Sequence, residues 1–502
     1  MSSIVRAKDA PRRPGRFLLA AFRPLAAAMN SKSIRKLVRR LQFARIVAQQ
    51  PRYAKAAYLL IRRPQELDPL TLGGLAESEL LPSILSSPLM WTGNAHVPLR
   101  LAKNLYLNGR RDQAFSIVRR SPGGGARMLE GELLMYSGDI ARARSIFSAA
   151  ADRAATKAGA LRNMAVCHYL EGDMDAAIDT IIVAAAMYPR NMPSMTFFSR
   201  IVRNSEDIDR YLREKLRIAK HGLTPGSSAQ LVRACGRAGA KRTAEMIASD
   251  AIINMCSSRR PEPEEAPEQS EQTAPKGSYS SENGDLILEH ISSVVDEANV
   301  RLFLMGGTLL GLIRDNQLLP WDKDLDFGCF AEDASISDLW QIFLDSPYFV
   351  PMGVVGDRLI KLRHMSGVTV DIFVNFKEND VRWHGGQFIC WRDKAFSLDE
   401  VTLQDRRFYI PRDPEAYLAG HYGEAWSQPD PDFDVFWEAP NAFNANPEHR
   451  YLNTIAKGLQ FLGARSPNTI RLRYERAMAG GAADVAEGYR YVLGRYDEFR
   501  LQ

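Results

Sequence analysis

The apolar positions divide the chain into a helical part and a part made of short strands. Between residues 66 and 256, apolar helices alternate with short turns that contain glycine. After residue 284 the pattern changes to short apolar runs rich in β-branched and aromatic residues, separated by turns. This order predicts an α+β chain, in which an N-terminal α-solenoid precedes an α/β domain with a small mixed sheet at residues 284–440.

The helical part repeats itself around its glycines. Gly138 and Gly172 each follow one apolar helix and precede another, and they are 34 residues apart. An alanine follows five residues after each of them, as expected where paired helices approach closely. The spacing resembles that of tetratricopeptide repeats, with weaker copies around Gly109 and Gly239. Such a solenoid either binds a peptide or a partner protein, or packs against the domain that follows it.

The first 65 residues are strongly basic, and we predict that they form a helical arm. They hold 16 Lys and Arg and one acidic residue, Asp9, whereas the whole chain has a net charge of +6. The excess of positive charge is therefore local and does not indicate a nucleic-acid-binding protein. The arm is either a solvated first helix of the next domain or a helix that lies on an anionic membrane surface. We predict a cytoplasmic protein that contacts the inner face of the membrane through residues 1–45.

Two further segments and the cysteines complete the organisation. Residues 257–283 are rich in Pro and Glu and almost free of apolar residues, which predicts a disordered linker. Residues 441–502 have a helical pattern, and we expect them to pack on the domain that precedes them. The five cysteines are scattered and form no C-x-x-C pair, which argues against a disulfide framework and a zinc cluster and favours a reducing compartment.

Candidate chemistry begins with three aspartates that alternate along a short strand. The two-residue period of a strand places the carboxylates of Asp322, Asp324 and Asp326 on one face. Like charges so close together are unfavourable unless a cation lies among them. Oxygen ligands select a hard ion, so we predict Mg²⁺ or Mn²⁺. The alternative is a solvated acidic turn.

A fourth carboxylate, Asp371, lies in the centre of another apolar strand. Because an Asp without a partner is costly to desolvate there, a shared metal ion, or a role as base beside it, explains its position. The preceding strand is expected to pair with this one across a hairpin turn. That pairing makes Arg358, Lys361 and Arg363 candidate phosphate ligands.

Upstream of the aspartates, a glycine-rich turn leads from a short strand into a helix. The turn consists of Gly306, Gly307 and Thr308. Two glycines let the backbone come close to a ligand, and a helix N-terminus offers free N–H groups and a positive dipole end to phosphate. We therefore predict that these three residues hold phosphate.

Together these residues resemble the LicD/fukutin family, which is built on the nucleotidyltransferase fold. The shared pattern runs through four elements: G-T-L-L-G at 307–311, Arg314, Pro-Trp-Asp at 320–322 and D-x-D at 324–326. The strand around Asp371 and the run Pro411–Trp426 are similar to later elements of the family. The resemblance covers about residues 285–435 and leaves out the repeats and the basic arm.

The resemblance implies a metal-dependent phosphotransferase. Relatives transfer a phosphocholine- or ribitol-phosphate-like group from a CDP-activated alcohol to a hydroxyl of a cell-surface or lipid-linked glycan, and release CMP. On that basis three aspartates bind the metal: Asp324, Asp326 and Asp371. Asp371 is either the third ligand or the base, Asp322 assists, and Arg314 or Lys361 balances charge on the leaving group.

Two other functions stay open. One is a nucleotidyltransferase that acts on a small molecule, which would release pyrophosphate instead of CMP. The other is a non-catalytic repeat scaffold. His364, His384 and His421 are scattered along the sequence, and we expect none of them to be catalytic.

Overall fold

A computed structural model of the chain describes nine segments: 96–218, 222–257, 281–319, 322–386, 389–403, 406–430, 432–443, 446–464 and 466–500. The predicted basic arm lies outside the described residues. So does the predicted linker, except for its two ends, which belong to helices. The chain forms two compact units, residues 1–122 and 123–502. Among the described helices, none combines the length and the apolar character needed to cross a bilayer.

In the first unit, the described residues form a pair of helices, α8 (His96–Leu107) and α9 (Arg111–Arg120). They pack through buried residues that include Leu105 and Ala114. The turn between them contains Gly109, whose φ of 74° is in the left-handed region that favours glycine.

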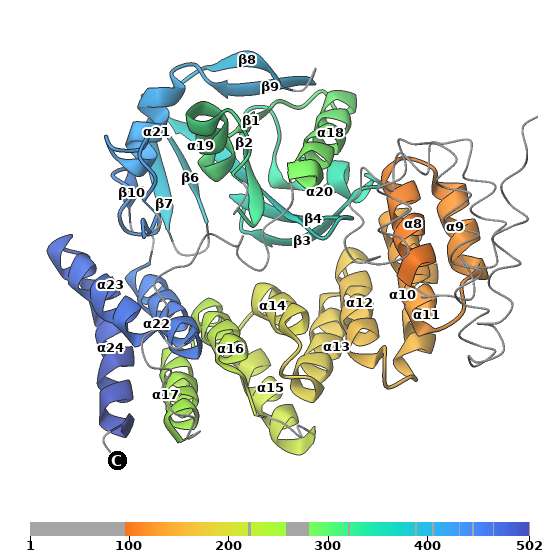
Figure 1. Ribbon diagram of the computed structural model, residues 1–502, viewed down its shortest axis with the longest axis horizontal. Coiled ribbons are helices and arrows are strands. Elements are labelled where there is room, and N and C mark those ends of the chain that lie inside the picture. Colours follow the sequence, from red (N-terminus) through yellow and green to blue (C-terminus); the bar gives the residue numbers. More distant parts are fainter. Residues whose placement is uncertain are drawn as a thin grey trace, which may run out of the picture. The chain divides into compact units, whose positions relative to one another are not determined.

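The second unit begins with helix pairs, as the glycine pattern predicts (Figure 1). Gly138 and Gly172 end the first helices of two pairs with φ of 80° and 81°. Gly131 lets two helices approach closely, because a Cβ at that position would lie 2.5 Å from the ring of Phe147. The helices are α10 (Gly124–Tyr136), α11 (Ile140–Ala151), α12 (Lys157–Leu170), α13 (Met174–Met187), α14 (Met192–Ile201), α15 (Ser205–Ile218), α16 (Pro225–Arg237) and α17 (Lys241–Ser257).

The strands after the linker form one mixed sheet, which in the described part of the chain has ten strands. Its main order is β10-β7-β6-β5-β2-β1-β9-β8, with β4 on β5 and β3 on β4. Only the pairs β2–β5 and β1–β9 are parallel among those described. The strands are β1 (Leu302–Leu304), β2 (Asp324–Phe330), β3 (Phe349–Val355), β4 (Leu359–His364), β5 (Thr369–Glu378), β6 (Val381–Gly385), β7 (Cys390–Lys394), β8 (Leu398–Leu403), β9 (Arg406–Pro411) and β10 (Ala442–Phe443).

Four helices cover this sheet and complete its core (Figure 1). Phe303, Phe327 and Ile372 are fully buried between the strands and the helices. Gly328 leaves room for the ring of Phe303, which a Cβ at that position would overlap. The helices are α18 (Ser281–Glu297), α19 (Gly306–Asp315), α20 (Ile336–Leu344) and α21 (Pro414–Tyr422). The predicted α+β class, a helical region followed by a mixed sheet, is confirmed.

The chain ends in α22 (Pro447–Gly463), α23 (Pro467–Ala479) and α24 (Ala483–Arg500), which correct one expectation. Their main packing partners are α16 and α17 of the repeats rather than the sheet domain. Arg233 of α16 donates to Asn453 of α22 at 3.1 Å, for example. Contact with the domain before them is mainly a group of ion pairs, such as Lys457–Asp434 at 2.6 Å. The helices add to the end of the solenoid because α16 presents buried apolar residues to them.

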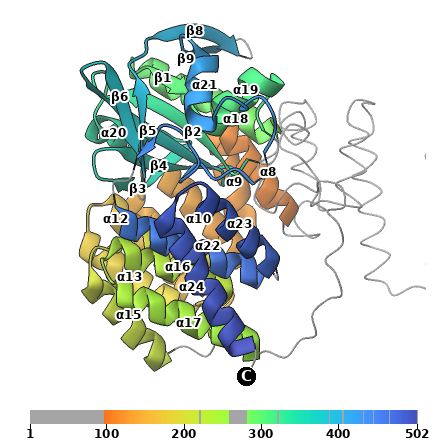
Figure 2. The ribbon, with the colours of Figure 1, turned by 90° about the vertical axis from the view of Figure 1, so that its left-hand side faces the viewer.

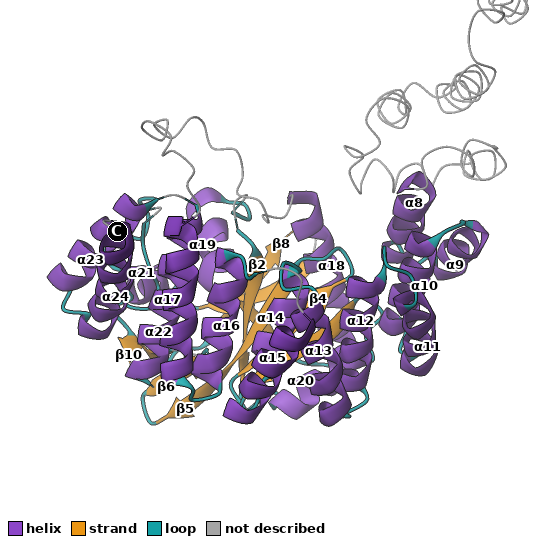
Figure 3. Cartoon of the chain, turned by 90° about the horizontal axis from the view of Figure 1, so that it is seen from below, coloured by secondary structure: helices purple, strands orange, loops and turns teal. Residues whose placement is uncertain are grey.

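The first helix of each repeat pair faces the sheet domain or the C-terminal helices (Figures 2 and 3). From α10, the Tyr136 hydroxyl accepts a hydrogen bond of 3.1 Å from Arg363 of β4. From α12, the ring of Tyr169 packs edge-on against Trp340 of α20. Helix α14 contacts strand β3 of the sheet domain. Within this unit, the repeats therefore pack directly against the domain that carries the aspartates.

Candidate active site

Two adjacent parallel strands bring the predicted carboxylates together. In the register of β2 and β5, Asp326 is directly opposite Asp371. Asp324 lies two residues before Asp326 and so faces the same side, whereas Leu325 and Phe327 are fully buried on the other. The acidic face of β2 thus meets Asp371 at the centre of the sheet.

The glycines of the turn are placed against these carboxylates. A Cβ on Gly306 would lie 2.5 Å from Oδ2 of Asp326, and a Cβ on Gly307 would overlap Oδ2 of Asp322. Gly306 also has a φ of 54°, which disfavours other residues. The two glycines therefore let Asp322 and Asp326 approach the first turn of α19.

Thr308 holds the same turn to the strand. It is 1% exposed, and its hydroxyl accepts a hydrogen bond of 2.9 Å from the backbone N–H of Asp326. This contact fixes the position of Asp326 relative to the N-terminus of α19. The structure thus gives Thr308 a positioning contact, and its predicted contact with phosphate stays a prediction.

Lys361 of β4 forms an ion pair with Asp371. The two residues are directly opposite each other in the antiparallel register of β4 and β5. Lys361 therefore neutralises one carboxylate of the cluster and fixes its orientation. Its predicted role beside a leaving group remains open, because the same ammonium group carries two further protons.

The carboxylates raise one another's pKa values. Burial, and then the charges of Asp371 and Asp322, raise the pKa of Asp324 to about 7. Burial, followed by Asp324 and Asp371, raises the pKa of Asp326 well above its usual range. Burial also raises the pKa of Asp322. Without a cation, the folded chain therefore disfavours the ionised form of three of these groups.

An oxygen-only donor set fits a hard divalent cation such as Mg²⁺. Asp324, Asp326 and Asp371 would hold it. Among the described residues, however, these aspartates do not form a group with three ligand atoms within 4.8 Å of one another. Mutual repulsion and the Lys361 ion pair are consistent with this spacing, which a bound cation would shorten.

The other predicted cations contact residues outside the aspartate cluster. Arg314 bonds its neighbour Asp315 at 3.0 and 3.1 Å. Arg363 is held by Tyr136, and Arg358 contacts the sulfur of Cys390 at 3.4 Å. The Pro-Trp pair of the family pattern, residues 320–321, lies outside the described residues.

The sequence pattern did not predict one cationic side chain near the aspartate cluster, that of Arg200. Arg200, at the end of α14, makes no hydrogen bond or ion pair with a described residue. Burial lowers the pKa of Arg200, and the charges of Asp371 and Asp324 oppose that shift. The structure therefore places a half-buried guanidinium from the repeats within electrostatic range of the aspartates. No local signal could have revealed it, because Arg200 precedes Asp324 by more than a hundred residues in a different type of fold.

Comparison with known proteins finds relatives of the sheet domain. Residues 299–413 match the family described as LicD/FKTN/FKRP, nucleotidyltransferase domain. Ribitol-5-phosphate transferase FKTN of Homo sapiens is 27% identical over 164 residues, which cover 31% of this chain and 35% of the relative. Ribitol 5-phosphate transferase FKRP of Homo sapiens is 43% identical over 45 residues, 9% of each chain. An uncharacterised protein of Rickettsia prowazekii is 24% identical over 146 residues, 28% of this chain and 53% of the relative.

The match is confined to the part of the chain that carries the aspartates. The chain spans about a third of the length of the FKTN relatives, and the helical repeats lie outside the family match. Within the match lie the glycine turn, the D-x-D strand and the strand of Asp371. Residues 299–413 are therefore similar to the nucleotidyltransferase domain of the LicD/FKTN/FKRP family.

Proposed function

We propose that this chain transfers a phospho-alcohol group from a CDP-activated alcohol to a hydroxyl of a cell-surface or lipid-linked glycan, and releases CMP. The observation that carries the proposal is the pairing of Asp326 and Asp371 across two parallel strands, with Asp324 on the same face. The names of the relatives, ribitol-5-phosphate transferases, support the type of group that is transferred.

In the proposed reaction, the acceptor oxygen bonds to the phosphorus that carries the alcohol. The bond from this phosphorus to the oxygen shared with CMP breaks, and CMP leaves with that oxygen. The proton of the acceptor hydroxyl passes to a carboxylate of the cluster or to solvent. Phosphoryl transfer of this kind depends mainly on alignment and on neutralising charge, and both are tasks of fixed side chains.

The residues divide these tasks. A divalent cation held by Asp324, Asp326 and Asp371 would neutralise charge on the diphosphate. Lys361 keeps Asp371 oriented, and Gly306 permits the close approach of Asp326. The guanidinium of Arg200 adds positive charge within electrostatic range of Asp371 and Asp324. We assign Asp371 to the cation rather than to the base role because it is the register partner of Asp326.

The test is a panel of CDP-alcohols incubated with purified chain and Mg²⁺, with release of CMP as the readout. Release of CMP that disappears in Asp324→Asn is the expected result. Asp399→Asn is the control. Asp399 lies on strand β8 of the same sheet and forms its ion pair with Arg412. Release of pyrophosphate from a nucleoside triphosphate, without any reaction of CDP-alcohols, would instead identify a nucleotidyltransferase.

We also propose that the protein works in the cytoplasm at the inner face of the membrane. The high positive charge of residues 1–65 supports this, and so does the scattered placement of the five cysteines, which form no C-x-x-C pair. Vesicles that contain anionic lipid should bind the whole chain and not a chain that lacks residues 1–45. Equal binding of the two chains would refute the proposal.

A further inference from the structure

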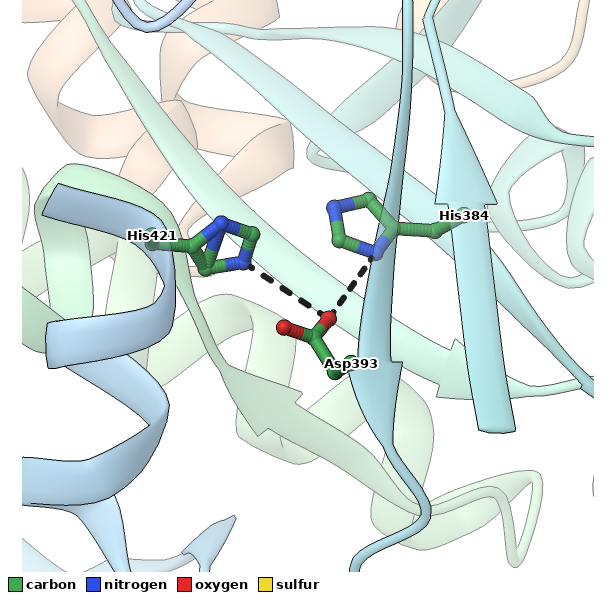
Figure 4. Close-up of side chains that lie close together, drawn as sticks. All are labelled: His384, Asp393 and His421. Carbon is green, nitrogen blue, oxygen red and sulfur yellow. Dashed lines mark ion pairs between the residues drawn. The ribbon is translucent and has the colours of Figure 1, made fainter. Parts of the chain in front are cut away.

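A second group of potential ligands lies on the same sheet, and the proposed function does not use it. His384 of β6, Asp393 of β7 and His421 of α21 point toward one another (Figure 4). One ligand atom from each lies within 4.8 Å of the other two. Within the described part of the chain, no other three His, Cys, Asp or Glu residues place their ligand atoms this close together. All three side chains are almost completely buried.

The distances centre on one carboxylate oxygen. Oδ2 of Asp393 is 3.8 Å from Nδ1 of His384 and 3.9 Å from Nε2 of His421. These contacts are too long for hydrogen bonds. Tetrahedral zinc, with bonds of about 2.0–2.1 Å, places its ligand atoms roughly 3.3 Å apart. Contraction of each of these two distances by about half an ångström would bring the carboxylate oxygen and each nitrogen to the spacing of zinc ligands.

Two of these three atoms have no hydrogen-bond partner in the described part of the chain. Nδ1 of His384 and Oδ2 of Asp393 are buried and make no hydrogen bond with the described residues. Buried polar atoms normally have a partner, so two that face each other at 3.8 Å indicate a missing one. A cation between them would satisfy both atoms at once.

We infer that His384, Asp393 and His421 form a binding site for a zinc-type divalent transition metal. Two imidazoles and one carboxylate suit such an ion, whereas Mg²⁺ prefers oxygen ligands only. Both rings are almost completely buried, and neutral imidazole is the form of histidine that binds such an ion. The scattered cysteines argue against a zinc site built from cysteines, but they do not bear on a site built from histidines and an aspartate.

Neighbouring side chains support the ligands from outside. The amide of Asn441 contacts Oδ1 of Asp393 at 2.7 Å and Nδ1 of His421 at 3.0 Å. The amide nitrogen of Asn441 donates to Oδ1 of Asp393 and so orients the carboxylate whose other oxygen lies near both rings. The hydroxyl of Tyr417, at 2.9 Å from Nε2 of His421, would give up its present hydrogen bond and lie beside the fourth position.

A metal at this site would join three elements that are separate in the sequence. It would fix α21 to β6 and β7, and α21 also carries Tyr417. Helix α21 also packs against α19, whose first turn carries Gly306 and Gly307. The metal would thus hold in place a helix that contacts the helix of the glycine turn.

The test uses the whole purified chain, stripped of metal with a chelator and titrated with Zn²⁺ against a coloured zinc indicator. We expect one tightly bound zinc per chain. In His384→Phe the affinity should fall by more than about 100-fold, because even partners of a ligand contribute 10- to 100-fold. Phenylalanine keeps a ring that can stack on Trp391, as His384 does. His168→Gln is the matched control, since His168 lies on α12 and pairs only weakly with Glu171 at 3.9 Å.

Two further variants make the result decisive. Asn441→Ala should weaken zinc binding by roughly 10- to 100-fold while leaving all three ligands in place. Asp324→Asn should retain the zinc, because it changes only the aspartate cluster, and this outcome does not depend on transferase activity. Zinc that is lost in Asp324→Asn but kept in His384→Phe would overturn the inference, and so would a folded wild-type chain that binds none. Melting curves without zinc show which variants are folded.

Discussion

The two clusters on the sheet differ in how the chain builds them. The aspartate cluster takes two of its members from one strand, β2, and the third from the neighbouring parallel strand. The histidine cluster takes one member from each of three elements, β6, β7 and α21. A strand period reveals the first cluster in the sequence, whereas nothing local connects His384 to His421. Repeated charge within one element can thus be read from a sequence, and so can a lone Asp in an apolar strand, whereas the meeting of two scattered histidines cannot.

The clusters also differ in what they lack. The aspartates carry excess negative charge and raise one another's pKa values, which a hard cation would relieve. The histidine cluster holds a single carboxylate, and two of its buried atoms have no hydrogen-bond partner among the described residues. The first arrangement suits a site that exchanges ligands during a reaction. The second suits an ion that stays in place.

The largest effect is expected from Asp326→Asn, which tests whether the aspartates are functional or structural. Release of CMP should fall by at least about 1,000-fold, since the divalent cation that would neutralise the diphosphate loses one of its ligands. The melting temperature should stay the same or rise, because a buried like charge is removed. A variant that loses stability and keeps its activity would contradict the proposed role.

Gly306→Ala tests two roles of this glycine, which are the close approach of Asp326 and the tolerance of a positive φ. Its Cβ would meet the carboxylate of Asp326, so we expect activity to fall by about 100-fold, as for a displacement of about 1 Å. Gly356→Ala is the control, because Gly356 has a similar φ, 56° against 54°, but no atom within 4 Å of the added carbon. Both variants should lose about 1–2 kcal/mol of stability through strain. Equal loss of activity in the two would mean that strain alone explains it.

Arg200→Ala should show whether the repeats take part in the reaction. We expect the KM for the CDP-alcohol to rise about tenfold, which corresponds to loss of about 1.4 kcal/mol of charge-assisted binding. Arg200→Lys should recover part of the affinity because it keeps the charge. Arg213→Ala, on an exposed position of α15, serves as the control. An unchanged KM in Arg200→Ala would limit the repeats to packing.

The smallest effect is a pH dependence of cation binding at the aspartates. The pKa of Asp324, about 7 in the folded chain without a cation, lies above its unfolded value. Protonation therefore stabilises the folded state, and that contribution is lost as the pH rises from about 4 to about 7. A bound cation needs the ionised form, so the affinity for Mn²⁺ should increase up to about tenfold between pH 6 and pH 8 and then level off. Calorimetric titration at several pH values measures this, and a flat profile would contradict the raised pKa.

Much of the fold could be predicted because its signals are local. Gly138 and Gly172 mark the ends of helices since only glycine adopts their φ without strain. The alternation in β2 follows from the strand period. The packing of α22 on α16 was missed because the helical pattern of residues 441–502 shows that a face is apolar, but not which surface covers it.

The sequence by itself determined the helix pairs, the acidic strand and the glycine turn beside it, because each is set by neighbouring residues and by backbone geometry. Only the tertiary structure decided that Lys361 neutralises Asp371, that Arg200 reaches the aspartates from a repeat helix, and that two histidines meet at Asp393. These contacts join residues from different elements, and the order of packing, which no short stretch of sequence encodes, determines which of them meet.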